Sequence, residues 1–309
     1  MRTSWIAGLL FLGAPLVASA EPATRVYLNG RPSPVYFNDG DSFRVLGGTY
    51  FGGKARLAGF NTLESFGPVH IWGDWHAKEL YAISKMATHN GANGVWRCTS
   101  DMSTDTYGRT LWFCPDLALD QVRRGFAHVL SIDENPGDPK LLEAQLDAQK
   151  NRRGMWAHGV PGYILTSLHS MSEGGKDGKQ YNRFVSTRDG HSASIAHSDT
   201  YDECQKVCFK ERPIPAEVVT EIVKRLTTEA PELVEGESPE RVFQIVEDYG
   251  RIGFFVGVKD EGKKAKLEEK LGAYRTEGAF GQVEEVVASC HIYVAFERRY
   301  GGKRAECLK

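Results

Sequence analysis

Short runs of alternating apolar and polar residues, separated by glycine-rich turns, occupy the chain from residue 25 to residue 114. Alternate side chains of a strand point to opposite faces, so this pattern predicts strands. Asn29-Gly30 is a strong hairpin-turn signal, and it predicts that the first two strands pair. The expected strands are Arg25 to Leu28, Val35 to Phe37, Ser42 to Leu46, Lys54 to Phe60, Val95 to Cys98 and Arg109 to Cys114.

Apolar residues spaced three or four apart predict helices between and after these strands. The expected helices run from Asp74 to His89, from Leu117 to Arg124 and from Pro139 to Arg153. Gly125 and Gly154 follow the last two, as glycine commonly does at the end of a helix. Strands and helices in this order predict an α+β unit with enough short strands for a closed barrel.

The pattern changes after residue 160. Residues 174–179 consist of glycine, lysine and aspartate, which predicts a polar linker or an exposed loop. Beyond it, spacing and alternation predict a second α+β domain, whose function this part of the sequence does not indicate. Its expected elements are a helix at 218–226, a helix capped by Ser238 with Pro239 at its first position, and strands at 252–258 and 292–296.

The first twenty residues have the features of an export signal. Arg2 gives a positive start, Trp5 to Val17 form an apolar run, and small residues precede Glu21. A membrane anchor is the alternative, but the apolar run is shorter than the ~20 residues that span a bilayer. We therefore expect cleavage after Ala20 and a secreted or periplasmic protein. The expected segments are a signal peptide at 1–20, a first domain at 21–160, a linker at 161–184 and a C-terminal domain at 185–309.

Composition is that of a soluble globular protein rather than of a dedicated binder of polyanions. Of the 309 residues, 41% are hydrophobic and 25% are charged, and the formal net charge is −2. Residues 21–160 carry 15 lysines and arginines against 15 aspartates and glutamates. Any attraction to phosphate must therefore come from a local basic cleft.

Six cysteines in an exported chain indicate disulfides. Cys98 and Cys114 close two of the expected strands, and their sulfurs would meet if those strands pair. The other four lie beyond residue 200, and their pairing stays open: Cys204, Cys208, Cys290 and Cys307. A zinc site is a less common alternative in an oxidising compartment, formed by His191, His197, Asp199, Cys204 and Cys208.

Three short motifs carry the candidate chemistry. Asp39 to Ser42 reads D-G-D-S, Arg56 to Glu64 reads R-L-A-G-F-N-T-L-E, and Thr104 to Arg109 reads T-D-T-Y-G-R. Two arginines suit a phosphate, because each guanidinium is a permanently charged fork. Carboxylate, amide and carbonyl oxygens suit a hard cation such as calcium, and a further carboxylate can activate water. Together these groups indicate phosphodiester hydrolysis.

In this order the three motifs resemble those of the thermonuclease family, whose prototype is staphylococcal nuclease. The resemblance covers about Val35 to His158, under half of the chain. It implies an α+β fold, with a five-stranded OB-fold β-barrel and three helices preceding the second α+β domain. It also implies an endonuclease that depends on calcium and hydrolyses both DNA and RNA.

The resemblance implies a site for one Ca²⁺ ion. Its ligands would be the side chains of Asp41 and Asn61 and the backbone carbonyl of Thr62. The family usually has a carboxylate where this chain has Asn61. An amide still offers an oxygen but carries no charge, so we expect a weakened cation site.

The remaining roles also follow from the resemblance. Arg56 and Arg109 would hold the phosphate, and Glu64 would orient or deprotonate the attacking water. Tyr107 stands where the family has a tyrosine near the nucleotide phosphate. The stacking tyrosines of the prototype correspond to Ser131 and Asp133, so base stacking there is expected to be lost.

Two other functions fit the same sequence. One is a catalytically weak OB-fold protein that binds nucleic acid, which Asn61 and the neutral charge favour. The other is a scaffold for a binding module in the C-terminal half.

Overall fold

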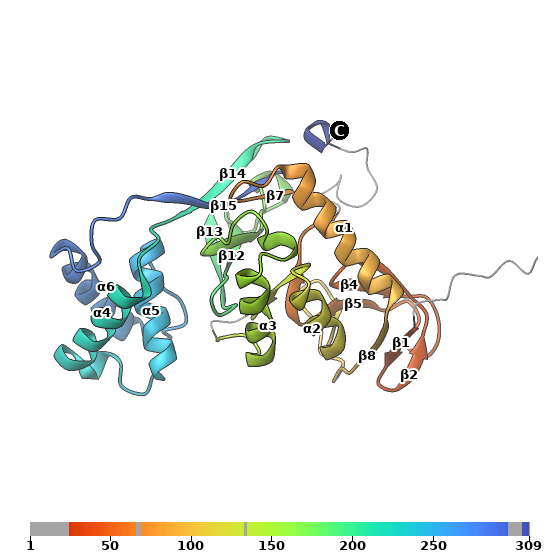
Figure 1. Cartoon of the computed structure of the whole chain (residues 1–309), viewed down its shortest axis with the longest axis horizontal. Coiled ribbons are helices and arrows are strands. Elements are labelled where there is room, and N and C mark those ends of the chain that lie inside the picture. Colours follow the sequence, from red (N-terminus) through yellow and green to blue (C-terminus); the bar gives the residue numbers. More distant parts are fainter. Residues whose placement is uncertain (1–24, 66–68, 133–134, 296–304, 309) are drawn as a thin grey trace, which may run out of the picture.

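The computed structural model describes residues 25–65, 69–132, 135–295 and 305–308, which form the mixed α+β structure in Figure 1. The first part contains β1 (Arg25–Leu28), β2 (Arg31–Ser33), β3 (Val35–Asp39), β4 (Ser42–Val45), β5 (Lys54–Leu57), β6 (Gly59–Thr62), β7 (Val69–Ile71), α1 (Ala77–Asn93), β8 (Val95–Cys98), β9 (Thr110–Trp112), α2 (Pro115–Arg123), β10 (Ala127–Leu130) and α3 (Pro139–Lys150). The second part contains β11 (Tyr163–Ser167), β12 (Gln180–Ser186), β13 (Ser192–His197), β14 (Lys206–Glu211), α4 (Ala216–Glu229), α5 (Pro239–Ile252), α6 (Glu261–Thr276) and β15 (Val286–Ile292). Single 3-10 turns occur at Gly154–Trp156, Met171–Glu173, Pro231–Leu233 and Glu306–Leu308.

Leu80 and Ile83 of α1 belong to one hydrophobic core of the first part, and the small sheets with α2 and α3 surround another. The strand orders are β3-β4-β5-β9, β2-β1-β8 and β10-β6, with parallel pairing of β1 to β8 and of β5 to β9. Phe43, Leu57 and Trp112 are at most 2% exposed inside this core. Within the described residues these strands do not join into one closed barrel. The expected α+β class is therefore confirmed, and the five-stranded barrel is not.

Turn conformation changes two of the expected strands. Asn29 (φ 46°) and Gly30 (φ 78°) form the predicted tight turn, and the hairpin partner of β1 is β2. The expected pairing of β1 with residues 35–37 is wrong, because β3 pairs with β4 instead. The expected strand from Lys54 to Phe60 is two strands, β5 and β6, since Gly59 at the start of β6 adopts a positive φ of 89°.

Helices α4, α5 and α6 pack together around a hydrophobic core of their own, at one end of the molecule (Figure 1). The hydroxyl of Ser238 accepts a hydrogen bond from the Arg241 backbone N–H and caps α5, as the sequence predicts. The expected strand at 252–258 is wrong: Ile252 ends α5, and Gly253 caps the helix with a φ of 88°. The strand expected at 292–296 is wrong beyond its first residue, because β15 ends at Ile292; Phe296 lies outside the described residues.

Strand pairing crosses from the first part into the second. β15 pairs with β14 on one side and with β7 on the other, so one sheet contains residues from both halves (Figure 1). Residues 161–184, expected as a linker, contain β11 and the first residues of β12, which pair in a sheet with β13. Further contacts join α3 to this sheet, since Gln145 Nε2 donates to the Thr187 carbonyl at 2.7 Å.

All six cysteines form disulfides. Cys98–Cys114 confirms the expected pairing in the first part, and the open question in the second is answered by Cys204–Cys307 and Cys208–Cys290. Cys208 and Cys290 are direct cross-strand partners of β14 and β15. These bonds consume the sulfur ligands of the zinc alternative, which is therefore wrong. They also indicate an oxidising compartment.

The N-terminal segment expected to be a signal peptide, residues 1–20, lies outside the described residues. Across the part of the chain that the structure describes, no helix combines the length and apolarity needed to cross a membrane.

Candidate active site

A partly buried ion pair connects two of the predicted site residues. Asp41, 2% exposed, lies in the turn between β3 and β4, and Arg56 lies on β5. Arg56 Nη1 donates to Asp41 Oδ1 at 2.6 Å, and Arg56 Nη2 donates to Asn61 Oδ1 at 2.6 Å. The second carboxylate oxygen of Asp41 accepts from the Thr62 backbone N–H at 2.7 Å. Asp41, Arg56, Asn61 and Thr62 therefore form one network.

Strand register creates this network. β4 and β5 are antiparallel with Ser42 opposite Arg56, so Asp41 lies beside the end of β5. The Leu57 backbone N–H donates to the Asp41 carbonyl at 2.8 Å and fixes the turn. After Gly59, β6 turns back and brings Asn61 to the same guanidinium. The spacing of the R-L-A-G-F-N-T motif thus has a local structural cause.

His128, which the sequence did not single out, sets the orientation of Asn61. It lies opposite Asn61 in the pairing of β10 with β6, and burial lowers its pKa to about 4. Its neutral ring donates from Nδ1 to the Val129 carbonyl at 2.9 Å and accepts at Nε2 from Asn61 Nδ2 at 3.1 Å. Asn61 Nδ2 also donates to the Thr62 carbonyl at 2.9 Å. The amide oxygen of Asn61 must therefore face Arg56.

Negative charge exceeds positive charge around Arg56. Burial raises the pKa of Asp39 well above its ordinary value, and the charges of Asp41 and Glu64 raise it further. Asp39 Oδ1 accepts from the hydroxyl of Ser42 at 2.7 Å, which favours its ionised form. Burial disfavours the charge of Arg56, but these carboxylates outweigh that cost and raise its pKa. An additional positive charge would therefore stabilise the ionised carboxylates of the site.

Glu64 follows β6 and is partly buried. Its carboxylate is one of the groups whose charge acts on Asp39 and Arg56, so it belongs to the same cluster. Its backbone N–H donates to His70 Nε2 at 3.5 Å. His70, on β7, in turn contacts His291 on β15 at 2.7 Å between Nδ1 and Nε2. The second half thus reaches the backbone of Glu64 through two buried histidines.

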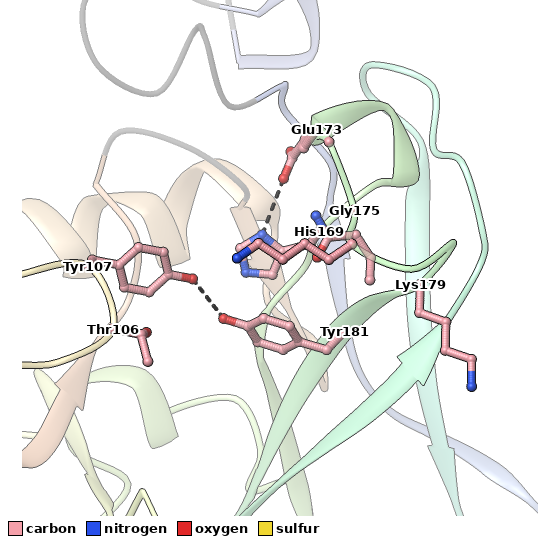
Figure 2. A pocket seen from close by; sticks show the side chains of 10 residues that line it. Thr106, Tyr107, His169, Glu173, Gly175, Lys179 and Tyr181 are labelled. Carbon is pink, nitrogen blue, oxygen red and sulfur yellow. Dashed lines mark hydrogen bonds and ion pairs between the residues drawn. The ribbon is translucent and has the colours of Figure 1, made fainter.

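Arg109 and Tyr107 lie in the turn before β9 and outside the Asp41 network. Asp105 organises this turn: its Oδ2 accepts from Arg109 Nε at 2.7 Å, and its Oδ1 accepts from the backbone N–H of Tyr107 at 2.9 Å. The charge of Asp105 also acts on Arg56, so the turn borders the network. Tyr107 is 60% exposed, and its hydroxyl lies 2.8 Å from that of Tyr181 (Figure 2).

The expected calcium ligands have suitable chemistry, but their oxygens are engaged. Among the described residues, no three His, Cys, Asp or Glu side chains are arranged as a metal site. Asp41 and Asn61 bind Arg56, and the Thr62 carbonyl accepts from Asn61. The buried Thr62 hydroxyl, however, has no hydrogen-bond partner among the described residues, so its oxygen is available as a metal ligand. The oxygen donors and surplus carboxylates fit a hard cation, provided that Arg56 moves away.

The structure brings together five of the seven predicted residues, namely Asp41, Arg56, Asn61, Thr62 and Glu64. It leaves Arg109 and Tyr107 at the border of the site. Asp39 and Asp105 belong to the motifs, but sequence reasoning gave them no role. The sequence could have indicated that Asp105 pairs with Arg109, because the two residues are four positions apart. His128 had none, because its strand contains four buried residues and shows no alternation.

Residues 55–158 match the family model described as staphylococcal nuclease homologue, a family whose members are generally nucleases. The matched segment includes Arg56, Asn61, Glu64 and Arg109, and Asp41 precedes it. No curated protein matches the chain. Residues 55–158 are therefore similar to the staphylococcal nuclease homologue family, and the match covers about a third of the chain.

Proposed function

We propose that this protein is an exported, calcium-dependent nuclease that hydrolyses phosphodiester bonds in both DNA and RNA. The observation that carries the proposal is the Asp41–Arg56–Asn61 network, with the Glu64 carboxylate in the same cluster, inside a domain related to nucleases. Arginine beside surplus carboxylates provides both a phosphate ligand and groups that attract a cation.

Each group has a distinct part in the proposed reaction. Arg56 and Arg109 bind the nonbridging phosphate oxygens and stabilise the charge that develops on them. Glu64 orients the attacking water and accepts its proton. Tyr107 contacts the substrate beside Arg109.

Asp41, Asn61 and the Thr62 carbonyl would hold one Ca²⁺ ion, which would neutralise phosphate charge and polarise the phosphoryl oxygen. Binding it requires Arg56 to leave Asp41 and Asn61, because the guanidinium now contacts both. That exchange would also free the guanidinium for the phosphate.

We also propose the finer features that the family implies. The strands of residues 21–160 correspond to the five-stranded OB barrel of the catalytic domain, and residues 185–309 belong to a second domain. Residues 1–20 are removed as a signal peptide, leaving a secreted or periplasmic protein. Three disulfides support an oxidising destination.

The test is incubation of the purified mature protein with supercoiled plasmid and with RNA, in calcium, in magnesium or in chelator. We expect both substrates to be cut in calcium and neither in chelator. Absence of cleavage under every condition would contradict the proposal. The preference between DNA and RNA is read from the same experiment.

One observation favours a second candidate, a nucleic-acid-binding protein with little catalysis. Arg56 already neutralises Asp41 and contacts Asn61, and a neutral amide attracts a cation less strongly than a carboxylate. Under this alternative the protein would bind an oligonucleotide equally well in chelator and in calcium, without cutting it.

A further inference from the structure

A pocket of about 530 Å³ lies between the Thr104–Arg109 turn and the second half of the chain (Figure 2). Thr106 and Tyr107 form one wall. The other wall consists of His169, Glu173, the glycine- and lysine-containing loop that follows, and Tyr181 at the start of β12. Pockets of this size hold small ligands or single nucleotides. The second wall lies outside the segment that matches the nuclease family.

Aromatic rings line the pocket from both halves. Tyr107 and Tyr181 point toward each other across it, with 2.8 Å between their hydroxyl oxygens (Figure 2). The His169 ring lies 4.7 Å from the Tyr181 ring, between centroids. Burial and the hydrogen bond with Tyr107 raise the pKa of Tyr181 to about 12, so its ring stays uncharged. Neutral aromatic faces bind unpaired bases by stacking, whatever the base.

Positive charge surrounds these rings. The Arg109 guanidinium lies 5.5 Å from the centre of the Tyr107 ring. Lys176 and Lys179 line the pocket, are exposed, and form no ion pair with any described residue. The one carboxylate among the lining residues, Glu173, is held by His169 Nδ1 at 3.2 Å and by the Tyr293 hydroxyl at 2.8 Å. The rim is therefore available to a phosphate backbone.

We propose that this pocket binds one unpaired base of a single-stranded nucleic acid, with Lys176 and Lys179 contacting the adjacent phosphates. The inference rests on the proposed function, because the strand held by Arg109 would continue into the pocket. Tyr181 then supplies a stacking ring from β12, where the sequence lacks the family's tyrosines after β10. Ser131, at one of those two positions, is described, and Asp133 lies outside the described residues.

Binding is measured by fluorescence anisotropy with a labelled single-stranded oligonucleotide and the full-length protein, in chelator so that no cleavage occurs. Tyr181→Ala should weaken binding about tenfold, which equals about 1.4 kcal/mol. Tyr181→Phe keeps the ring and should change the affinity less than twofold. Lys176→Ala with Lys179→Ala should weaken binding and make it less dependent on salt. The matched control is Lys224→Ala with Lys266→Ala, the same charge change on exposed positions of α4 and α6.

The outcomes separate this proposal from the proposed function. If the Tyr181→Ala variant and the variant with both pocket lysines replaced keep the wild-type affinity, the pocket does not bind the base, even if the protein cuts DNA. Weakened binding in those variants, in a protein that never cuts, would support the pocket and contradict the nuclease. Equal losses in the two lysine pairs would show general charge attraction and overturn the pocket. If Tyr181→Ala fails to fold, the affinity of the Lys176→Ala, Lys179→Ala variant alone tests the proposal, because both lysines are exposed.

Discussion

Two charged clusters, one in each half of the protein, use similar side chains in different ways. Around Arg56, the carboxylates of Asp39, Asp41 and Glu64 exceed the positive charge available to them. In the second half, the imidazole of His191 lies between two carboxylates, 2.5 Å from Asp189 Oδ1 and 2.9 Å from Asp248 Oδ2. His191 must carry both ring protons, since it donates to a carboxylate from each nitrogen.

In the second cluster, around His191, the charges and hydrogen bonds are matched by groups of the protein itself. Burial disfavours the charge of His191, but Asp248 and Asp189 outweigh it and raise the pKa to about 9. Asp248 also accepts from the Tyr163 hydroxyl at 2.7 Å, and Arg188 pairs with Asp189 at 2.9 Å. Because Asp248 lies on α5 and Tyr163 on β11, the cluster joins the helices to the sheet.

The difference indicates where a ligand can act. A buried cluster whose hydrogen bonds and charges are matched is not stabilised by an added ion. Such a cluster therefore contributes to the stability of the fold. A partly exposed cluster with surplus carboxylates gains from a cation, so its effect falls on binding and catalysis. Removing a charge from each cluster should therefore change different measurements.

The largest effect is expected from Asp248→Ala, which removes the buried acceptor of His191 Nε2 and of the Tyr163 hydroxyl and leaves Asp189 as the remaining carboxylate on His191. We expect the free energy of unfolding to fall by about 3–5 kcal/mol, as measured by urea denaturation. Hydrolysis by the folded fraction should be unchanged. Glu240→Ala is the control, because Glu240 is an exposed carboxylate on the same helix. Equal losses from both variants would contradict a special role for the cluster.

Stability should fall at alkaline pH. The folded pKa of His191, about 9, lies above its ordinary 6.5, so its contribution is complete below about pH 6.5 and is lost as pH rises through 9. This loss amounts to about 3 kcal/mol. His191 lowers the pKa of Asp189 to about 2 against the cost of burial, so that contribution is lost only as pH falls toward 2. Urea unfolding at pH 6 and pH 10 measures the loss, and an unchanged or increased stability at pH 10 would contradict it.

Arg109→Ala should lower kcat/KM for plasmid cleavage by about a hundredfold, because a group that stabilises transition-state charge is lost. The melting temperature should change little, since Arg109 pairs with Asp105 at a partly exposed position. Arg44→Ala removes an exposed arginine from β4 and serves as the control. A similar loss of activity in both variants would mean that general charge, rather than this turn, binds the substrate.

The smallest effect is expected from Asn61→Asp. A carboxylate there would attract calcium more strongly, so the calcium concentration for half-maximal activity should fall several-fold. It would also stabilise the protonated form of His128 and raise that pKa from about 4, which NMR titration can follow. A calcium midpoint that stays or rises would exclude Asn61 as a ligand.

The sequence motifs predict that Asp41, Arg56 and Asn61 lie together, but they do not predict all the contacts of these residues. The motifs carry local information, and the D-G-D turn and the glycine after β5 suffice to bring Asp41, Arg56 and Asn61 together. The contact of Asn61 with His128 depends on pairing between strands distant in sequence. Likewise, β7 pairs with β15, whose own alternation says nothing about its partner. Residues 252–258 alternate like a strand, but Ile252 ends α5 and Gly253 is its C-cap, so tertiary context overrides the pattern.

Glu64→Gln shows whether the cluster around Arg56 performs hydrolysis. The measurement is the rate of plasmid cleavage in calcium by wild-type protein and by the variant, at equal melting temperature and equal oligonucleotide affinity. We expect cleavage by the wild type and a rate in the variant that is lower by about a hundredfold or more, because the general base is lost. Equal rates in the two proteins would contradict it.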